Sequence, residues 1–188
     1  MTEKVTALEL SPVDPLPPET QKYFDICMDK LGLVPNVLKA YAFDVDKLNA
    51  FTTLYNDLML ADSGLTKLQR EMIAVVVSSL NRCVYCLTAH GQAVRELSGD
   101  PVLGEHLIMN YRVASLTPKE RAMLDFAVKM TEASHTIEEE DREALRAAGW
   151  TDRDIWDIAN VTGFFNMTNR VASATDMAPN PEYYARNR

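Results

Sequence analysis

The amino-acid sequence predicts an all-α fold, and three observations support this class. The chain of 188 residues holds only seven glycines. No segment shows the alternation of apolar and polar residues that is typical of a half-buried strand. Apolar residues instead recur at spacings of three and four, which places them on one face of a helix. We therefore expect helices throughout the chain, apart from its two ends.

The length suffices for one hydrophobic core, so we predict a single helical domain over residues 19–178. Four prolines lie among residues 1–18, which predicts an extended arm across its own domain or a neighbouring subunit. Residues 179–188 also contain prolines, and we expect a tail that packs on another subunit or is mobile.

Four helices are expected in the first half of the domain, and each begins at a proline or an N-cap residue: 18–31, 35–41, 44–59 and 66–79. Gly32 is a natural stop for the first helix. Cys27 falls on the apolar face of that helix and is interpreted as a core residue.

Further helices are expected in the second half: 83–97, 103–111, 117–130, 136–149 and a helix or helix pair over 151–165. Thr117 with Glu120 and Thr136 with Glu139 show the capping-box pattern, in which two side chains satisfy backbone amides reciprocally. These pairs predict two of the helix starts.

A shift of eighty-five positions along the sequence aligns Asn81 with Asn166 and Thr66 with Thr151. We interpret these matches as an internal repeat of a helix-turn-helix unit, in which only the first copy keeps the cysteines. The alternative is chance similarity over a short window.

The net charge of −8 disfavours nucleic acids and anionic membranes as partners, because a phosphate-binding surface needs clustered Lys and Arg. The first residues show no apolar signal segment, and no apolar run approaches the length of a membrane span. We expect a cytoplasmic protein, in which cysteines are kept reduced between turnovers.

Two of the three cysteines and one of the three histidines lie together in Cys83-x-x-Cys86-x-x-x-His90. Asn81 ends an apolar run, so Cys83 falls in the first turn of the next helix and all three side chains project from one face. Unpaired amides and the helix dipole stabilise a thiolate at this position. His90 is placed to accept or return the Cys86 proton.

Glu71 lies on the preceding helix and reaches His90 only if the two helices pack side by side, which a short link favours. A buried carboxylate needs such a partner. The pair would form a Glu-His relay that serves the dithiol. The alternative is a solvated Glu71 that pairs with Arg70 or Lys67.

Two other interpretations of the cysteines remain. Buried cysteines often serve as small hydrophobic residues. Cys83, Cys86 and His90 could also supply three zinc ligands, but a structural zinc site usually has four ligands and the chain shows no second Cys/His cluster. We therefore expect neither a metal nor a bound organic cofactor.

Glu71, eleven intervening residues and then Cys83-x-Tyr85-Cys86-x-x-x-His90 resemble the core of the alkyl hydroperoxidase D (AhpD) and carboxymuconolactone decarboxylase superfamily, in particular its uncharacterised peroxidase-related branch. The resemblance implies an AhpD-like helical bundle that forms homo-oligomers, with dimer, trimer and hexamer all open. It also implies a hydroperoxide substrate, reduced through the cysteine pair, and an unidentified dithiol reductant.

By position, the resemblance implies that Cys86 is the peroxidatic cysteine, Cys83 the resolving one, His90 the base and Glu71 its partner. Tyr85 is a departure, because the best-studied members have a histidine between the cysteines. A phenol with a pKa near ~10 is a poor base at neutral pH, but it can donate a hydrogen bond or hold a water.

Two other functions stay open beside the peroxidase. The superfamily includes decarboxylases of the muconolactone type, which use acid/base chemistry and lack the cysteine pair, so Cys83 and Cys86 argue against this activity. The chain could also be a non-enzymatic oligomer whose dithiol senses redox conditions. Activity that survives thiol alkylation would favour the first alternative.

Overall fold

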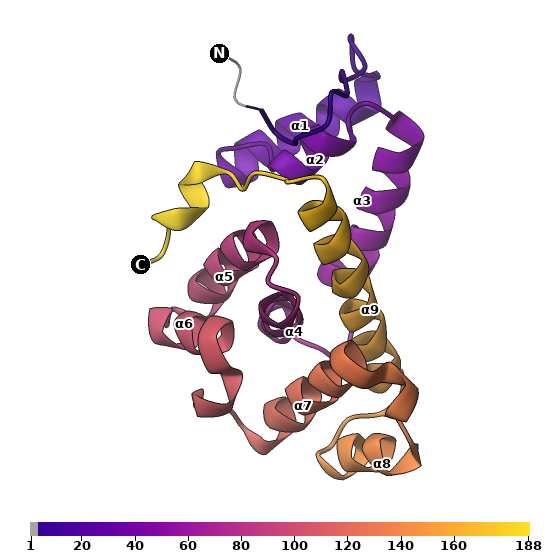
Figure 1. The fold of residues 1–188 in the computed structure, drawn as a ribbon, viewed down its shortest axis with the longest axis vertical. Coiled ribbons are helices and arrows are strands. Elements are labelled where there is room, and N and C mark those ends of the chain that lie inside the picture. Colours follow the sequence, from indigo (N-terminus) through magenta and orange to yellow (C-terminus); the bar gives the residue numbers. More distant parts are fainter. Residues whose placement is uncertain (1–3) are drawn as a thin grey trace.

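The computed structural model describes residues 4–188, and these form the predicted all-α fold without a strand (Figure 1). The α-helices are α1 Pro18–Leu31, α2 Asn36–Tyr41, α3 Val45–Leu60, α4 Lys67–Leu80, α5 Val84–Ser98, α6 Pro101–Asn110, α7 Pro118–Ala133, α8 Glu139–Ala147 and α9 Asp152–Ala174. The 3₁₀-helices are η1 Tyr111–Val113, η2 Ser134–Thr136 and η3 Pro181–Tyr184. In the described range, every helix is too short or too polar to cross a lipid bilayer.

Helix α4 is the centre of the fold. Figure 1 shows it end-on, with α5, α6, α7 and α9 around it. Its residues 72–77 are all 0% or 1% exposed. A helix that is apolar on all sides is stable only inside a core. Glu71 directly precedes this segment, so α4 carries its carboxylate into the interior.

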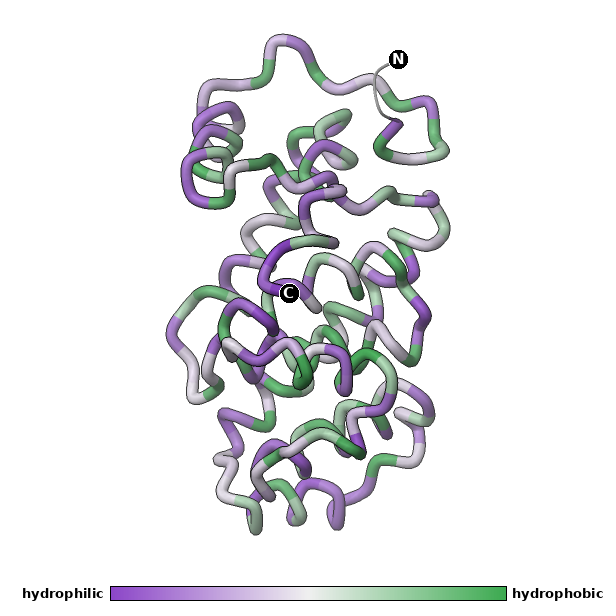
Figure 2. Tube along the Cα trace, turned by 90° about the vertical axis from the view of Figure 1, so that its left-hand side faces the viewer, coloured by the Kyte–Doolittle hydropathy of each residue, from purple (hydrophilic) through white to green (hydrophobic). Residues whose placement is uncertain are grey.

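Most of the other helices bury only one face. Figure 2 shows hydrophobic and hydrophilic residues succeeding one another along them. The helices α1, α2 and α3 lie together at one end of the molecule, and α9 extends from the core to meet them (Figure 1). In α1, Ile26, Met28 and Leu31 are 40%, 52% and 45% exposed, so this helix contributes little to the core.

The predicted helix starts and stops are mostly confirmed. Gly32 ends α1 in the left-handed conformation, with φ of 68°. Thr66, Thr117 and Thr151 each form a capping box at the start of α4, α7 and α9. The capping box predicted at Thr136 is wrong.

Helix α8 begins three residues after Thr136. The Thr136 hydroxyl donates to the Ala133 carbonyl at 2.8 Å, which places the threonine in η2 instead. The capping box at α8 joins Glu138 and Asp141, whose carboxylate accepts the Glu138 amide at 2.8 Å. A local side-chain hydrogen bond to the preceding turn therefore displaces the predicted helix start.

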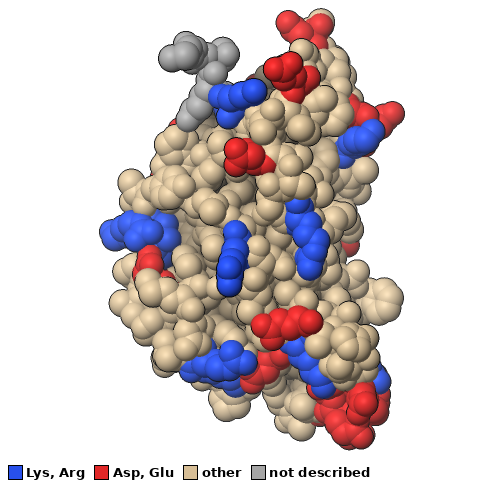
Figure 3. Space-filling view, in the orientation of Figure 1, with Lys and Arg blue, Asp and Glu red and all other residues tan. Residues whose placement is uncertain are grey.

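Acidic side chains gather over α8 on the face shown in Figure 3. Residues 138–141 are all Glu or Asp. Negative side chains stabilise a helix N-terminus, because they face unpaired amides and the positive end of the dipole. Glu139 also pairs with Arg142 at 2.6 Å and with Arg146 at 2.7 Å. The start of α8 and these ion pairs account for the acidic cluster.

The N-terminal arm lies across its own chain, which was one of two predicted alternatives. The Val5 carbonyl accepts the Ala178 amide at 2.9 Å, and the Val13 amide donates to the Ala42 carbonyl at 2.9 Å. Residues 1–3 of the predicted arm lie outside the described residues.

The C-terminal tail packs against its own chain; the prediction that it packs on another subunit stays a prediction. The Asn180 side chain accepts the Asn36 amide at 2.7 Å, and Tyr183 is 7% exposed. The Arg95 guanidinium donates to the carbonyls of Tyr183 and Arg186 at 3.1 and 3.2 Å. Polar residues from distant parts of the sequence hold the tail in place.

The predicted internal repeat is only partly visible. The helices α4 and α9 both start with a capping box, but α9 continues through Asn166 and the turn expected there is absent. The physical difference is Arg82, whose positive φ of 53° interrupts the helix after Asn81. The side chains of Asn81 and Asn166 hydrogen-bond to each other at 3.1 Å, so the two positions meet in space.

Candidate active site

Cys83 is the N-cap of α5, as the spacing predicts. Its backbone is extended, and its sulfur accepts the Cys86 amide at 3.4 Å. A side-chain acceptor at this position satisfies one of the amides that have no partner within the helix. Cys83 is 1% exposed and Cys86 is 3% exposed, so both thiols are buried at the mouth of the helix.

The two thiols are neighbours and influence each other's acidity in opposite directions. The hydrogen bond with the Cys86 thiol lowers the pKa of Cys83 to about 6, with help from the Cys86 amide and the Ser173 side chain. The same hydrogen bond, together with burial, raises the pKa of Cys86. The resting dithiol therefore carries its negative charge on Cys83, while Cys86 donates to it.

A polar network behind the cysteines was not predicted from the sequence. The Asn169 amide donates to the Ser78 hydroxyl at 2.9 Å and accepts from the Asn81 side chain at 3.0 Å. Hydrogen bonds from Asn169 and Ser78 act to lower the pKa of Cys86, so they favour its thiolate. The only sequence signal for this region was the repeat that aligns Asn81 with Asn166, a residue of α9.

The contact between Glu71 and His90 is present. The Nδ1 atom of His90 lies 2.6 Å from Oε2 of Glu71, and α4 and α5 pack along each other. The edge of the His90 ring meets the Phe165 ring, with centroids 4.7 Å apart. A carboxylate on one ring nitrogen and an aromatic contact fix the ring, so Nε2 is the nitrogen left for chemistry.

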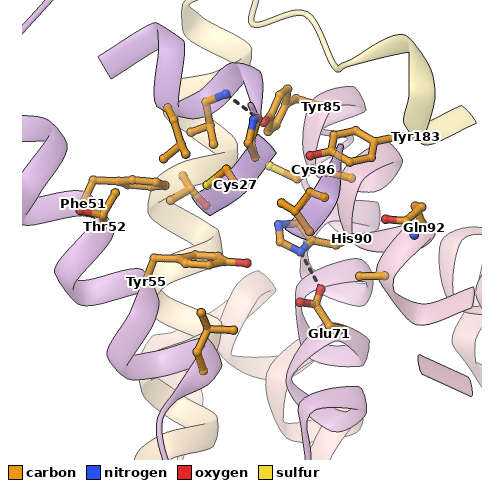
Figure 4. A pocket seen from close by; sticks show the side chains of 18 of the residues that line it. Cys27, Phe51, Thr52, Tyr55, Glu71, Tyr85, Cys86, His90, Gln92 and Tyr183 are labelled. Carbon is orange, nitrogen blue, oxygen red and sulfur yellow. Dashed lines mark hydrogen bonds and ion pairs between the residues drawn. The ribbon is translucent and has the colours of Figure 1, made fainter. Parts of the chain in front are cut away.

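A cavity of about 740 Å³ lies between α1, α2 and α3 on one side and α5 and α9 on the other (Figure 4). Cys86, His90, Glu71 and Tyr85 line it, but Cys83 does not. Figure 4 shows the His90 and Glu71 side chains paired on the wall of the cavity, near Cys86. The neutral thiol of the pair is thus the one within reach of a ligand.

Tyr85 ties α5 to α2. Its hydroxyl accepts the Val37 amide at 2.9 Å, and burial raises the pKa of the phenol. The hydrogen bond leaves its O–H free to donate, and the raised pKa keeps the phenol protonated at neutral pH, so no phenolate is available to act as a base. Its position suits a role in holding the cavity wall.

Cys27 is not a core residue, contrary to the sequence-based prediction. It is partly exposed and lines the same cavity as Cys86, and burial raises its pKa. The reason is that α1 covers the cavity instead of packing into the core. In the part of the chain that the structure describes, no three His, Cys, Asp or Glu side chains are grouped as metal ligands.

Comparisons with known proteins agree with this architecture. Residues 46–129 match the Carboxymuconolactone decarboxylase family. An uncharacterized peroxidase-related protein from Silicibacter sp. TM1040 is 72% identical, with a TM-score of 0.97 over 99% of this chain and 97% of that one. A protein from Ralstonia eutropha JMP134, described as an alkylhydroperoxidase AhpD core and an uncharacterized peroxidase-related protein, is 41% identical, with a TM-score of 0.94 over 99% and 98%.

A more distant solved structure shares the fold alone. The debrominase Bmp8 is 18% identical, with a TM-score of 0.78 over 94% of this chain and 95% of that one. Among curated proteins, none matches the chain. With 72% and 41% identity to the two peroxidase-related proteins over nearly the whole length, this chain belongs to the AhpD and carboxymuconolactone decarboxylase superfamily, in its branch of uncharacterised peroxidase-related proteins.

Proposed function

We propose that the protein is a thiol-dependent peroxidase that reduces organic hydroperoxides through the Cys83–Cys86 pair. One observation carries the proposal: the Cys86 thiol and the His90–Glu71 pair line one cavity, while Cys83 sits directly behind as a hydrogen-bonded partner. Family membership supports the peroxidase-related class.

In the first step, the Cys86 sulfur attacks the terminal oxygen of the hydroperoxide. The sulfur–oxygen bond forms as the O–O bond breaks, which leaves a sulfenic acid on Cys86 and an alkoxide. The Cys86 proton moves to the Cys83 thiolate along their shared hydrogen bond. His90 enters this step with the proton that Cys83 has lost, and it delivers this proton to the alkoxide, which departs as an alcohol.

In the second step, Cys83 gives its proton to His90 and attacks the Cys86 sulfenic sulfur. A disulfide forms and hydroxide leaves, taking the proton from His90 to become water. The dithiol has then supplied two electrons, and the hydroperoxide has become an alcohol and water. A separate dithiol reduces the disulfide and restores the site.

Glu71 keeps His90 competent for both proton transfers. A carboxylate on Nδ1 holds the ring orientation and stabilises the imidazolium that forms when Nε2 accepts a proton. When the negative charge moves from Cys83 to Cys86, Asn169 and Ser78 stabilise the Cys86 thiolate, because their hydrogen bonds lower the pKa of Cys86. Tyr85 holds the wall and takes no proton.

Variants of the cysteines test this cycle, with cumene hydroperoxide as substrate and dithiothreitol as donor. The Cys86→Ser variant is expected to lose turnover. When dithiothreitol is left out, the Cys83→Ser variant is expected to consume one equivalent of hydroperoxide per chain and then stop, with a sulfenic acid on Cys86 that dimedone traps. The Glu71→Gln variant, which keeps both thiols, is expected to turn over about tenfold to a hundredfold more slowly.

The Cys27→Ser variant is the matched control, since it removes a thiol from the same cavity but not from the pair. It should keep its turnover. Full turnover in Cys86→Ser would refute the proposal, and a trapped sulfenic acid on Cys83 would reverse the two roles. Turnover that survives alkylation of both thiols would favour the acid/base decarboxylase chemistry of the superfamily.

A further inference from the structure

The far wall of the cavity is aromatic. Five rings follow one another from α2 through α3 to α9, and the fifth meets the His90 ring: Tyr41, Phe51, Tyr55, Phe164 and Phe165. The Tyr41 and Phe51 centroids are 4.8 Å apart with nearly parallel planes, and the Phe51 and Phe164 centroids are 5.7 Å apart. Such a wall offers flat faces and ring edges to a bound ring.

Three phenol groups on this cavity, those of Tyr41, Tyr55 and Tyr183, have no partner within the described residues, and the last two point at the reactive groups. The hydroxyl of Tyr55 makes no hydrogen bond to residues 4–188, and neither does that of Tyr183, whereas the Tyr23 hydroxyl donates to Asn56 at 3.1 Å. Figure 4 shows the Tyr55 hydroxyl pointing across the cavity toward His90 and Glu71, and the Tyr183 hydroxyl pointing toward Cys86.

Both phenols stay protonated in this setting. Burial, followed by the nearby Glu71 carboxylate, raises the pKa of Tyr55 well above its ordinary range. Burial also raises the pKa of Tyr183 to about 12. They are therefore hydrogen-bond donors over the whole range in which the dithiol works.

We infer that the cavity takes a hydroperoxide with an aromatic ring on the carbon next to the peroxide, held with its ring on the aromatic wall and its inner oxygen on the Tyr55 hydroxyl. This inference rests on the proposed function and names its substrate class. The ring fills the space beside Phe51, and the peroxide reaches Cys86. Tyr183 donates to the terminal oxygen as Cys86 attacks it.

The reaction gives Tyr55 a specific task. The O–O bond breaks toward the inner oxygen, which becomes an alkoxide before His90 protonates it. A donor already aimed at that oxygen stabilises the charge as it develops, and removal of one such donor from other enzymes slows the chemical step about 10²–10³-fold. Hydrogen peroxide has no ring for the wall and fills little of a cavity of about 740 Å³.

Two substrates that differ only in the ring test the wall. Cumene hydroperoxide and tert-butyl hydroperoxide share a tertiary carbon and differ by one phenyl group in place of a methyl. The protein is expected to show a kcat/KM for cumene hydroperoxide at least about tenfold higher, because one buried ring contributes that much or more. The Phe51→Leu variant should lower this preference, because it removes a ring from the wall.

The Tyr55→Phe variant tests the hydrogen bond. It should lower kcat for both substrates by about tenfold to a hundredfold and keep the preference between them, because the hydroxyl acts on the peroxide and not on the ring. The Tyr184→Phe variant is the matched control: Tyr184 is 51% exposed in the same tail as Tyr183, and does not line the cavity. Alkylation of Cys86 by iodoacetamide should proceed equally in Tyr55→Phe and in the parent, which shows that the dithiol is intact.

Equal use of the two hydroperoxides would overturn the ring assignment, and an unchanged kcat in Tyr55→Phe would overturn the hydrogen bond. Binding of 2-phenylpropan-2-ol, the product of cumene hydroperoxide, separates this inference from the peroxidase proposal. If the reduced protein binds the alcohol and Phe51→Leu weakens that binding, but no hydroperoxide is turned over, the ligand class stands and the peroxidase function is wrong. If it binds no alcohol and turns over both hydroperoxides equally, the peroxidase stands and the inference is wrong.

Discussion

At the scale of single residues, Cys83 is the more acidic thiol of the pair, and Cys86 is the thiol that faces the cavity. Cys83 carries the resting charge because it accepts the Cys86 thiol and a helix amide, yet only Cys86 lines the cavity. The spacing places both sulfurs at the start of a helix and cannot distinguish these two properties. Attack by Cys86 thus requires its proton to move to Cys83, a distance of one hydrogen bond.

A pH titration of thiolate absorbance tests the acidity of Cys83 in a Cys27→Ser background, which removes the third thiol. One thiolate should appear with a midpoint near 6, the pKa of Cys83, well below the ordinary value of 9.0. Because the Cys86 hydrogen bond is the largest cause, Cys86→Ala should move the midpoint upward by more than one pH unit. A midpoint near 9, or one that Cys86→Ala leaves unchanged, would contradict the effect of Cys86 on the acidity of Cys83.

At the scale of elements, the start of α4 meets the start of α9 where Gly64 lies against the capping box of α9. A Cβ atom on Gly64, just before α4, would lie 1.8 Å from Oδ1 of Asp154. The other carboxylate oxygen of Asp154 accepts the Thr151 amide at 2.9 Å and so caps α9. The absence of a side chain at Gly64 lets the two helix starts approach each other.

The Gly64→Ala variant should therefore lower the free energy of unfolding by about 1–3 kcal/mol, because Asp154 must move and the cap of α9 is disturbed. Thermal or urea unfolding measures the loss. Gly163→Ala is the matched control, since its Cβ would lie 3.8 Å from the Met130 side chain and alanine favours the helix by up to about 1 kcal/mol. Equal effects of the two variants would contradict the role of Gly64.

At the scale of the whole molecule, the N-terminal arm and α1 expose apolar side chains: Leu8, Leu10, Val13, Ile26, Met28 and Leu31 are 38–52% exposed. Exposed apolar side chains are common singly, but many on neighbouring segments are typical of interaction surfaces. The homo-oligomer predicted from the family resemblance would account for it.

We expect sedimentation velocity to give a mass of at least two chains at micromolar concentration. Each chain has a mass of 21.1 kDa, so dimer, trimer and hexamer are readily distinguished. The same measurement with oxidised protein shows whether the disulfide changes assembly, as a redox-sensing module would require. A single species of 21.1 kDa in both states would contradict the expected oligomer.

Most of the fold could be predicted from the sequence because its signals are local. Gly32, Thr66 and Thr117 mark helix boundaries through contacts within a few residues, and the structure confirms each of them. The capping box predicted at Thr136 is wrong because the threonine hydroxyl bonds to the Ala133 carbonyl instead. The contacts of the tail with its own chain could not be predicted for a different reason: its partners, such as Arg95, lie far away along the chain.

The sequence by itself determined the helical class and the motif in which Cys83, Cys86 and His90 share one helix, since both follow from spacing along the chain. Only the tertiary structure decided which thiol carries the charge, which one faces the cavity, and that Tyr55 lies opposite His90. The physical reason is that desolvation, hydrogen bonds between side chains and cavity walls depend on groups brought together by packing. Spacing along one helix contains no information about those groups.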